Sequence, residues 1–240
     1  PMQTTNINWT DKVWNPVTGC TKISAGCKNC YAESIANRFW KNRKFTDIVC
    51  HEDRLHQPFG FKKPVKIFVN SMSDIFHKDM PEEYLDRIFE VIENTPHHTY
   101  QILTKRADRM YDYLSKRPVP SNVWLGVTVE NKQQGLPRID KLRHLKAKVL
   151  FLSVEPLLED LGKMNLKNID WVIVGGESGN KARPMDKEWI VNIKQQCETE
   201  GIAFFFKQWG TWGEDKIKRN KKLNGKQLDG KIWQQYPEII

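Results

Sequence analysis

Three cysteines lie within eleven residues near the N-terminus, in the stretch GCTKISAGCKNC that ends at Cys30. Cys20, Cys27 and Cys30 have the spacing C-x6-C-x2-C, and they account for three of the five cysteines in the chain. Thiolates are the ligands that soft metals prefer, and crowded cysteines in a chain without an export signal favour metal binding over disulfides. The spacing therefore predicts a metal centre.

Two kinds of metal centre are compatible with three close thiolates. A structural zinc site needs four protein ligands, and Cys50, His51 and His56 are candidates for the fourth. A [4Fe–4S] cluster held by three thiolates leaves one iron without a protein ligand, and a substrate or cofactor can chelate that iron. The first centre would belong to a non-catalytic, zinc-stabilised nucleic-acid-binding protein, and the second to an enzyme.

The rest of the chain predicts the elements that position this loop. Apolar runs rich in β-branched residues alternate with segments of helical period. The expected strands are 66–71, 99–105, 123–129, 148–154, 170–176 and 202–210, after a first short strand near 13–17. This alternation indicates βαβ units and a parallel sheet. We expect an α/β fold, a partial or irregular (β/α) barrel of about six to seven parallel strands over residues 1–209, with a basic C-terminal extension at 210–240.

The cysteines belong to a longer motif, WNPVTGC at Trp14–Cys20 followed by Cys27 and by CYAE at Cys30–Glu33. With three close cysteines after the first strand of a (β/α) barrel, the chain resembles the radical S-adenosylmethionine (radical SAM) superfamily. It departs from the usual C-x3-C-x2-C spacing, and Asn29 stands where an aromatic or apolar residue is usual. It resembles more closely an uncharacterised, often phage-associated family that carries the whole motif.

The resemblance implies that Cys20, Cys27 and Cys30 bind a [4Fe–4S] cluster and that S-adenosylmethionine chelates the open iron. Reductive cleavage would then give a 5′-deoxyadenosyl radical for hydrogen abstraction, with an external electron donor such as flavodoxin or ferredoxin. Polar residues at strand ends line the mouth of such a barrel. The candidates for cofactor binding are Ser71, Ser73, Asp74, Lys105, Thr128, Glu130, Ser153 and Glu155. The candidate catalytic residues are Cys50, Glu155 and Lys207.

Simpler interpretations of these residues remain open. Strand ends meet loops, and loops are polar in any protein. Cys50 is compatible with an unreactive thiol, a zinc ligand or a hydrogen-atom donor. The glycines of GGES, at Gly175–Ser178, suit a close approach of the backbone to a ligand.

The net charge of +9 favours anionic partners. Basic residues are concentrated at Arg38–Lys44 and Lys216–Lys222, and Trp209 and Trp212 precede the second cluster. We expect DNA, RNA or a nucleotide as substrate, in a base-modifying or repair-lyase reaction; the alternative is a solvated positive surface. No apolar run is long enough to span a membrane, and the N-terminus shows no secretory pattern. These features predict a cytoplasmic protein.

Overall fold

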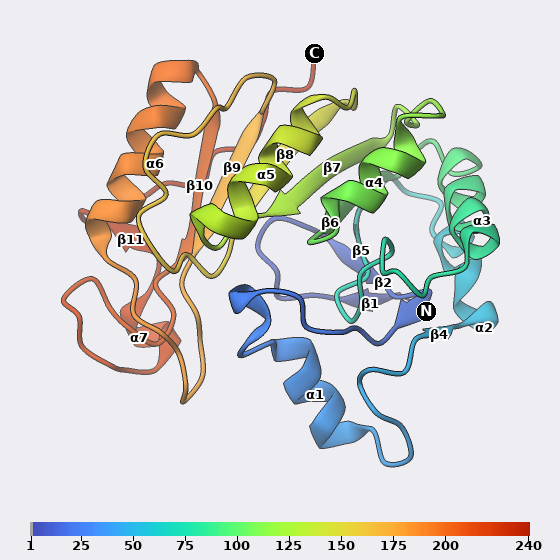
Figure 1. Ribbon diagram of the computed structural model, residues 1–240, viewed down its shortest axis with the longest axis horizontal. Coiled ribbons are helices and arrows are strands. Elements are labelled where there is room, and N and C mark those ends of the chain that lie inside the picture. Colours follow the sequence, from blue (N-terminus) through green and yellow to red (C-terminus); the bar gives the residue numbers. More distant parts are fainter. Residues whose placement is uncertain (1) are drawn as a thin grey trace. The chain divides into compact units, whose positions relative to one another are not determined.

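The computed structural model describes residues 2–240 (Figure 1). Its helices are α1 (Tyr31–Phe39), α2 (Glu52–Leu55), α3 (Glu82–Glu93), α4 (Ala107–Leu114), α5 (Lys132–Arg143), α6 (Lys187–Glu200) and α7 (Lys221–Asn224), with 3-10 turns η1 (Ala25–Cys27) and η2 (Gln57–Gly60). Its strands are β1 (Gln3–Thr4), β2 (Lys12–Trp14), β3 (Val17–Thr18), β4 (Val49–Cys50), β5 (Lys66–Val69), β6 (Thr99–Thr104), β7 (Val123–Thr128), β8 (Val149–Val154), β9 (Trp171–Gly175), β10 (Ala203–Gln208), β11 (Gln227–Leu228) and β12 (Lys231–Ile232).

The central sheet has eight strands within the described residues, in the order β1-β2-β5-β6-β7-β8-β9-β10. Strands β2, β5 and β6 pair in parallel, as do β8, β9 and β10, and β1 pairs antiparallel with β2. Neighbours in the sheet follow the order of the chain, as expected when helices connect parallel strands. The expected α/β fold with a mostly parallel sheet, consistent with a partial (β/α) barrel, is confirmed.

The chain divides into two compact units, each of which is discontinuous in sequence. Unit 1 contains the residues up to Ile23 together with Cys30–Gly126 and Leu145–Lys148. Unit 2 contains Ser24–Asn29, Val127–His144 and Val149–Ile240. The C-terminal residues that we expected as an extension of the barrel cluster with unit 2.

In unit 1 the first strand is shorter than expected. β2 ends at Trp14, and the chain then turns through Pro16, which has no N–H to donate to a strand ladder. After this turn, β3 leaves the central sheet and pairs antiparallel with β4, so that Val17 lies opposite Cys50. The hydroxyl of Tyr84, on α3, holds the turn by donating to the Pro16 carbonyl at 3.1 Å. The chain therefore leaves the central sheet after Trp14, whereas the sequence pattern predicts a first strand that extends to about residue 17.

In unit 2, β8 and β9 are buried along their whole length, as their continuous apolar runs predict. Helix α5 begins at Lys132, earlier than its apolar periodicity indicates, because Asn131 caps it by accepting from Gln134 N at 2.9 Å. Pro137 lies inside this helix. Helix α6 ends at Gly201, whose φ of +68° gives the left-handed C-cap that glycine adopts readily.

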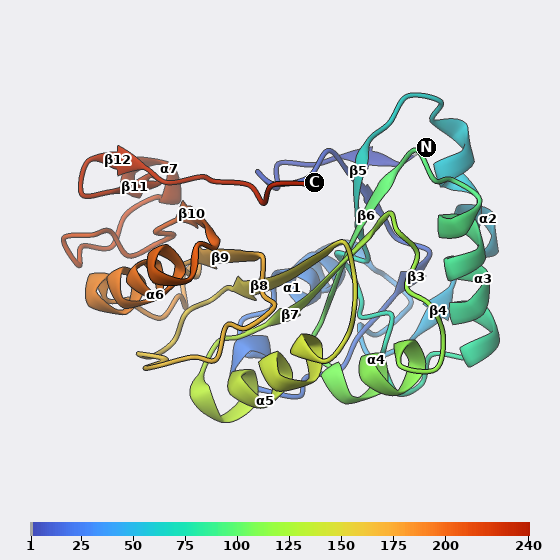
Figure 2. The same ribbon diagram turned by 90° about the horizontal axis from the view of Figure 1, so that it is seen from above.

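The C-terminal segment forms the small hairpin that its turn residues predict. β11 and β12 pair antiparallel across Asp229 and Gly230, both with positive φ. Figure 2 shows α7, β11 and β12 grouped beside β10 in unit 2. Trp209 is 2% exposed, so it packs in the core and offers no stacking surface. No helix among residues 2–240 combines the length and the apolar character needed to cross a bilayer.

Candidate functional site

Cys20 is placed by a glycine that no other residue could replace. Gly19 has a φ of +100°, and a Cβ at this position would lie 2.1 Å from the carbonyl oxygen of Asp47. Backbone hydrogen bonds fix the chain on both sides of the cysteine: Gly19 N donates to Met72 O at 2.9 Å, and Cys20 N donates to Phe45 O at 2.9 Å. The backbone that carries the Cys20 thiol is therefore fixed by hydrogen bonds and by the close contact at Gly19.

Cys30 occupies the N-cap of α1 and lies near the same apolar cluster as Cys20. Both cysteines pack against a buried group made of Ala32, Ala36 and Phe45. Both are partly buried free thiols, without a disulfide. Cys20 and Cys30, the two predicted metal ligands that belong to unit 1, thus pack against the same apolar cluster.

A buried charge network adjoins Cys20. Arg106 Nη1 lies 3.6 Å from Cys20 Sγ, within hydrogen-bond reach of sulfur, and 3.1 Å from Asp74 Oδ2. Asp74 also accepts from the Thr104 hydroxyl at 2.7 and 2.8 Å and from Lys105 N at 2.9 Å. Burial lowers the pKa of Arg106, but the Asp74 carboxylate and the Cys20 thiol outweigh it and raise that pKa overall. Asp74 therefore holds a charged guanidinium against the sulfur.

The same arginine fixes the residue after the cysteine. Arg106 Nη2 donates to Thr21 O at 3.0 Å, and the Thr21 hydroxyl lies 2.8 Å from His77 Nε2. Burial, and then the nearby Arg106 charge, lower the pKa of His77, so this fully buried imidazole is neutral at pH 7. Cys20 is thus bounded by polar groups that are already hydrogen-bonded to the protein.

The loop after β5 is tied to the segment that precedes Cys20. The Ser73 hydroxyl donates to Val17 O at 3.0 Å, and Ser71 Oγ lies within 3.4 Å of the Asn15 side chain. Asn70 has a φ of +64° and is 4% exposed, and its Nδ2 has no hydrogen-bond partner among residues 2–240. The predicted candidates Ser71 and Ser73 therefore position the cysteine loop, whereas Asn70 retains a buried donor.

In unit 2, Cys27 lies on the short segment Ser24–Asn29 and is 7% exposed. Asn29 Nδ2 donates to Glu177 Oε1 at 2.8 Å. Arg183 donates to the same carboxylate through Nε and Nη2, at 3.1 and 2.7 Å, and reaches Ala25 O through Nη1 at 3.0 Å. These contacts form a clamp, which we define as Asn29, Glu177 and Arg183. The clamp fixes the segment that carries Cys27.

The electrostatics of the clamp agree with its geometry. Burial alone would raise the pKa of Glu177, but the hydrogen bonds from Arg183 and Asn29 lower it below the ordinary glutamate value. The glycine before Glu177 is needed for packing: a Cβ on Gly176 would lie 1.8 Å from Trp209 O. Gly176, the second glycine of GGES, therefore serves a close approach between two backbones of the protein, at a position where the sequence suggested a ligand.

The segment Ser24–Asn29 also rests on a buried carboxylate. A Cβ on Gly26 would lie 2.4 Å from the carboxyl carbon of Glu130, which is fully buried. Arg138 Nη1 donates to Glu130 Oε2 at 3.0 Å and to the Thr128 hydroxyl at 3.2 Å. Arg138 is itself 5% exposed. Thr128 and Glu130, both predicted as cofactor contacts, are thus engaged by an arginine of α5.

The ends of β8 and β10 bring two further candidates together. Lys207 Nζ lies 3.1 Å from Glu155 Oε2, and Glu155 Oε1 is buried with no hydrogen-bond partner within residues 2–240. Gly175, on the strand between them, leaves the space they occupy: a Cβ there would lie 3.2 Å from Glu155 Cγ. Ser153, at 2% exposed, is nearly inaccessible. Glu155 and Lys207 are thus two predicted residues whose side chains the structure shows in direct contact.

The remaining cysteines have unreactive surroundings. Burial, and then the Glu52 carboxylate, raise the pKa of Cys50, whose backbone pairs with β3. Burial, followed by Glu198, raises the pKa of Cys197 to about 12. A low pKa marks a nucleophilic thiol, so neither position is built for nucleophilic chemistry.

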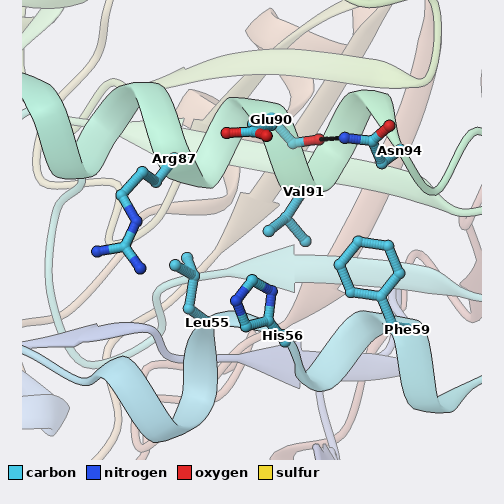
Figure 3. Close-up of a pocket in the computed structure, with 7 residues that line it drawn as sticks. All are labelled: Leu55, His56, Phe59, Arg87, Glu90, Val91 and Asn94. Carbon is cyan, nitrogen blue, oxygen red and sulfur yellow. Dashed lines mark hydrogen bonds between the residues drawn. The ribbon is translucent and has the colours of Figure 1, made fainter.

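A separate pocket in unit 1 lies between the α2–η2 segment and α3 (Figure 3). Its lining consists of Leu55, His56, Phe59, Arg87, Glu90, Val91 and Asn94. None of the predicted cofactor-binding or catalytic residues is among them. Arg87, drawn at its edge, is held in a two-point contact by Glu52, at 2.6 and 2.7 Å.

The predicted site residues are divided between the units. Unit 1 holds Cys20, Cys30, Cys50, Ser71, Ser73, Asp74 and Lys105; unit 2 holds Cys27, Thr128, Glu130, Ser153, Glu155 and Lys207. Within residues 2–240, no group of three or more His, Cys, Asp or Glu side chains is arranged to hold a metal ion. Sequence reasoning assigned no role to Asn29, Arg138 or Arg183, and it did not choose Arg106 from among the polar residues at the strand ends. The sequence contains one indication of the buried arginine, because Arg138 lies on the same face of α5 as the apolar residues Ile139 and Leu142.

The fold is similar to solved structures of spore photoproduct lyase. A cysteine-to-alanine mutant with dinucleoside spore photoproduct is 15% identical, with a TM-score of 0.53, over 82% of this chain and 63% of that one. A tyrosine-to-phenylalanine mutant is 13% identical, also with a TM-score of 0.53, over 83% and 76%. A double mutant with bound AdoMet and dinucleoside spore photoproduct is 14% identical, with a TM-score of 0.51, over 82% and 63%. This chain thus spans less than two thirds of the first of these structures.

The profile of a family described as "Protein of unknown function (DUF5131)" matches residues 4–237. No protein with a curated description matches the chain significantly.

Proposed function

This chain belongs to the family described as "Protein of unknown function (DUF5131)". We propose that the chain is a radical SAM enzyme that acts on a nucleic acid or nucleotide-like substrate. One observation carries the proposal. Three free thiols lie between the first parallel strand and the first helix of a fold similar to a lyase whose structures contain AdoMet and a dinucleoside photoproduct. In (β/α) barrels this is the end at which active sites form.

The donor set fits a [4Fe–4S] cluster. Cys20, Cys27 and Cys30 are free, and thiolates are the protein ligands of such clusters. Asn70 and Glu155 each keep a buried polar atom without a protein partner at a strand end, and buried polar groups are otherwise almost always satisfied. When bound, the cluster and S-adenosylmethionine supply an electron and a 5′-deoxyadenosyl radical that removes a hydrogen atom from the substrate.

The chain's own residues would support this chemistry in distinct ways. Arg106 donates to the sulfur of Cys20, and a hydrogen bond to a ligating sulfur changes the reduction potential of a cluster. The clamp holds the segment that carries Cys27. Asp74 and Glu130 are each held by an arginine, so we assign them to positioning and assign Glu155 and Lys207 to contact with the cofactor or substrate.

The substrate class rests on charge and on the similar structures. The net charge of +9 attracts phosphates, and the lyase structures contain a dinucleoside lesion. A base-modifying or repair-lyase reaction, with an external protein as electron donor, would use both features.

Anaerobic reconstitution with iron and sulfide tests the proposal. The wild-type chain should turn brown, bind about four iron atoms, and after reduction convert S-adenosylmethionine to 5′-deoxyadenosine and methionine. C20A, C27A and C30A should each lose iron and activity, whereas C197A, which alters a core thiol, should keep its iron. A colourless protein with one tightly bound zinc, or equal loss of metal in C50A, would establish a closed four-ligand site instead.

A further inference from the structure

Helix α1 carries more apolar surface than its own unit covers. Tyr31, Ile35 and Phe39 follow one another at four-residue spacing, so they share one face of the helix. They are 55%, 38% and 64% exposed. The neighbouring face, with Ala32 and Ala36, is the one that packs into the protein. Figure 1 shows α1 as a helix at the margin of the unit 1 ribbon. Three large apolar side chains on one exposed helix face indicate a surface that is covered by a partner.

Exposed cations lie at the end of α1 and in the segment that follows it. Arg38, Lys41 and Lys44 are exposed, and none of their side chains is ion-paired within residues 2–240. The guanidinium of Arg38 lies 5.2 Å from the ring centre of Phe39. Glu33, the acidic residue of α1, is already paired with a lysine at 2.7 Å. The apolar face is therefore bordered by free positive charge.

The second basic cluster, in the C-terminal segment, is different. Lys216 contacts Asp186 at 3.2 Å. Arg219 contacts Asp215 at 2.5 Å. Lys218 donates to a backbone carbonyl at 2.8 Å. Much of the charge that the sequence places in this cluster is used inside unit 2, whereas the cations beside α1 remain available to a partner.

We propose that the exposed face of α1, defined by Tyr31, Ile35 and Phe39, stacks against unpaired bases of the polynucleotide substrate while Arg38 and its neighbouring lysines contact the phosphates. The inference rests on the proposed function, because it assumes a nucleic-acid substrate. Aromatic rings bind bases of any sequence by stacking, and cations bind the backbone. Helix α1 begins one residue after Cys30 and is about 14 Å long, so stacked bases would lie within one helix length of that thiol.

Charge decides between the possible occupants of the face. A second copy of this chain would bring a second set of unpaired cations to the same place, and like charges oppose such an interface. An acidic electron-transfer protein matches the charge but not the two exposed rings, which single-stranded nucleic acid uses directly. The chemistry of this face therefore fits an unpaired polynucleotide segment.

Fluorescence anisotropy with a labelled single-stranded oligonucleotide, and with the duplex of the same sequence, tests the inference on the full chain. Wild type should bind the single strand more tightly than the duplex. F39L keeps an apolar side chain but loses the ring, and Y31L loses both the ring and the hydroxyl that donates to Ser71 O at 3.2 Å. Each should weaken single-strand binding at least about fivefold, with an unchanged salt dependence. F59L alters an exposed ring in the pocket between the α2–η2 segment and α3. It is the matched control and should bind as wild type does. The double variant K41Q/K44Q should reduce the slope of log affinity against log salt by about 1.4.

The outcomes separate this inference from the proposed function. Unchanged binding by F39L and Y31L, with tight binding by wild type, overturns the role of α1 and leaves a nucleic-acid substrate in place. An absence of binding by wild type at low salt removes nucleic acid from the proposed function, while cluster assembly and S-adenosylmethionine cleavage are measured independently. Self-association that F39L abolishes, or slower reduction of the cluster by ferredoxin in K41Q/K44Q with oligonucleotide binding intact, would assign the face to another occupant.

Discussion

The substitution E177A should release the segment that carries Cys27 without unfolding the protein. Glu177 is 8% exposed and accepts from Asn29 and from Arg183, and Arg183 in turn reaches Ala25 O. A hydrogen bond to a charged group contributes about 1.5–3 kcal/mol. Because the Arg183 side chain is 26% exposed, we take a value near the lower end. A loss of about 2 kcal/mol from the opening free energy of Ser24–Asn29 corresponds to about 30-fold faster amide exchange.

Hydrogen–deuterium exchange resolved to this segment measures the effect. The Cys27 amide is a suitable reporter because it donates to Ser24 O at 3.0 Å. E177Q keeps an oxygen acceptor for Asn29 and should fall between E177A and wild type. E200A removes an exposed glutamate of unit 2 that touches none of these residues, and it should exchange as wild type does. If the amides of Ser24–Asn29 exchange equally fast in E177A and wild type, the clamp does not hold the cysteine segment.

The clamp also predicts a pH dependence. The hydrogen bonds depress the pKa of Glu177 in the folded state, so the charged form stabilises the fold. That stabilisation is present above the ordinary glutamate pKa of about 4.3 and is lost as the pH falls through the depressed folded value. Protection of the segment against exchange, after correction for the intrinsic pH dependence of amide exchange, should therefore decrease below about pH 4 in wild type and change less with pH in E177A.

Three further predictions follow from single contacts. G176A should lower the free energy of unfolding, measured by chemical denaturation, by more than about 3 kcal/mol, because its methyl group would lie 1.8 Å from Trp209 O. G60A, whose methyl group would have nothing within 4 Å, should change that free energy by less than about 1 kcal/mol. Equal effects of the two substitutions would contradict the close approach at Gly176. D74A should destabilise unit 1 by about 3 kcal/mol, because it leaves the partly buried Arg106 without its carboxylate, and the double variant with R106M should recover part of that loss. In native-state alkylation E52Q should make Cys50 react faster than in wild type, because it removes a charge that raises the thiol pKa, while Cys197, with a pKa of about 12, stays unlabelled.

The strands could be predicted from the sequence because their signal is local. The run at Lys148–Val154 is apolar at five of its seven positions and becomes β8 with a one-residue difference at its start. The position of the cysteine loop also followed from local pattern. The hydrogen bond from Asn29 to Glu177 did not, because these residues are 148 positions apart in the chain. Only the folded chain brings such partners together.

Buried arginines were the least predictable part of the site. Arg138 is expected on the surface by residue type, since charged side chains are almost never fully buried without a partner. Its partner Glu130 lies eight residues earlier, outside the i, i+4 spacing that would have indicated a pair on one helix. The glycine pair shows a related ambiguity. Close packing of two backbones and close approach to a ligand require the same residue, so sequence alone does not separate them.

The interleaving of the two units has a consequence for dissection and for inheritance of this protein. Unit 2 takes the six residues Ser24–Asn29 from a stretch that otherwise belongs to unit 1, and unit 1 takes Leu145–Lys148 from a stretch that otherwise belongs to unit 2. No single cut in the chain releases either unit complete, so neither can be expressed as a contiguous fragment or exchanged between genes as a module. Cys27 would be lost from unit 2 by any N-terminal truncation that reached it. A crossover at any single point therefore divides at least one of the two units between two parental sequences.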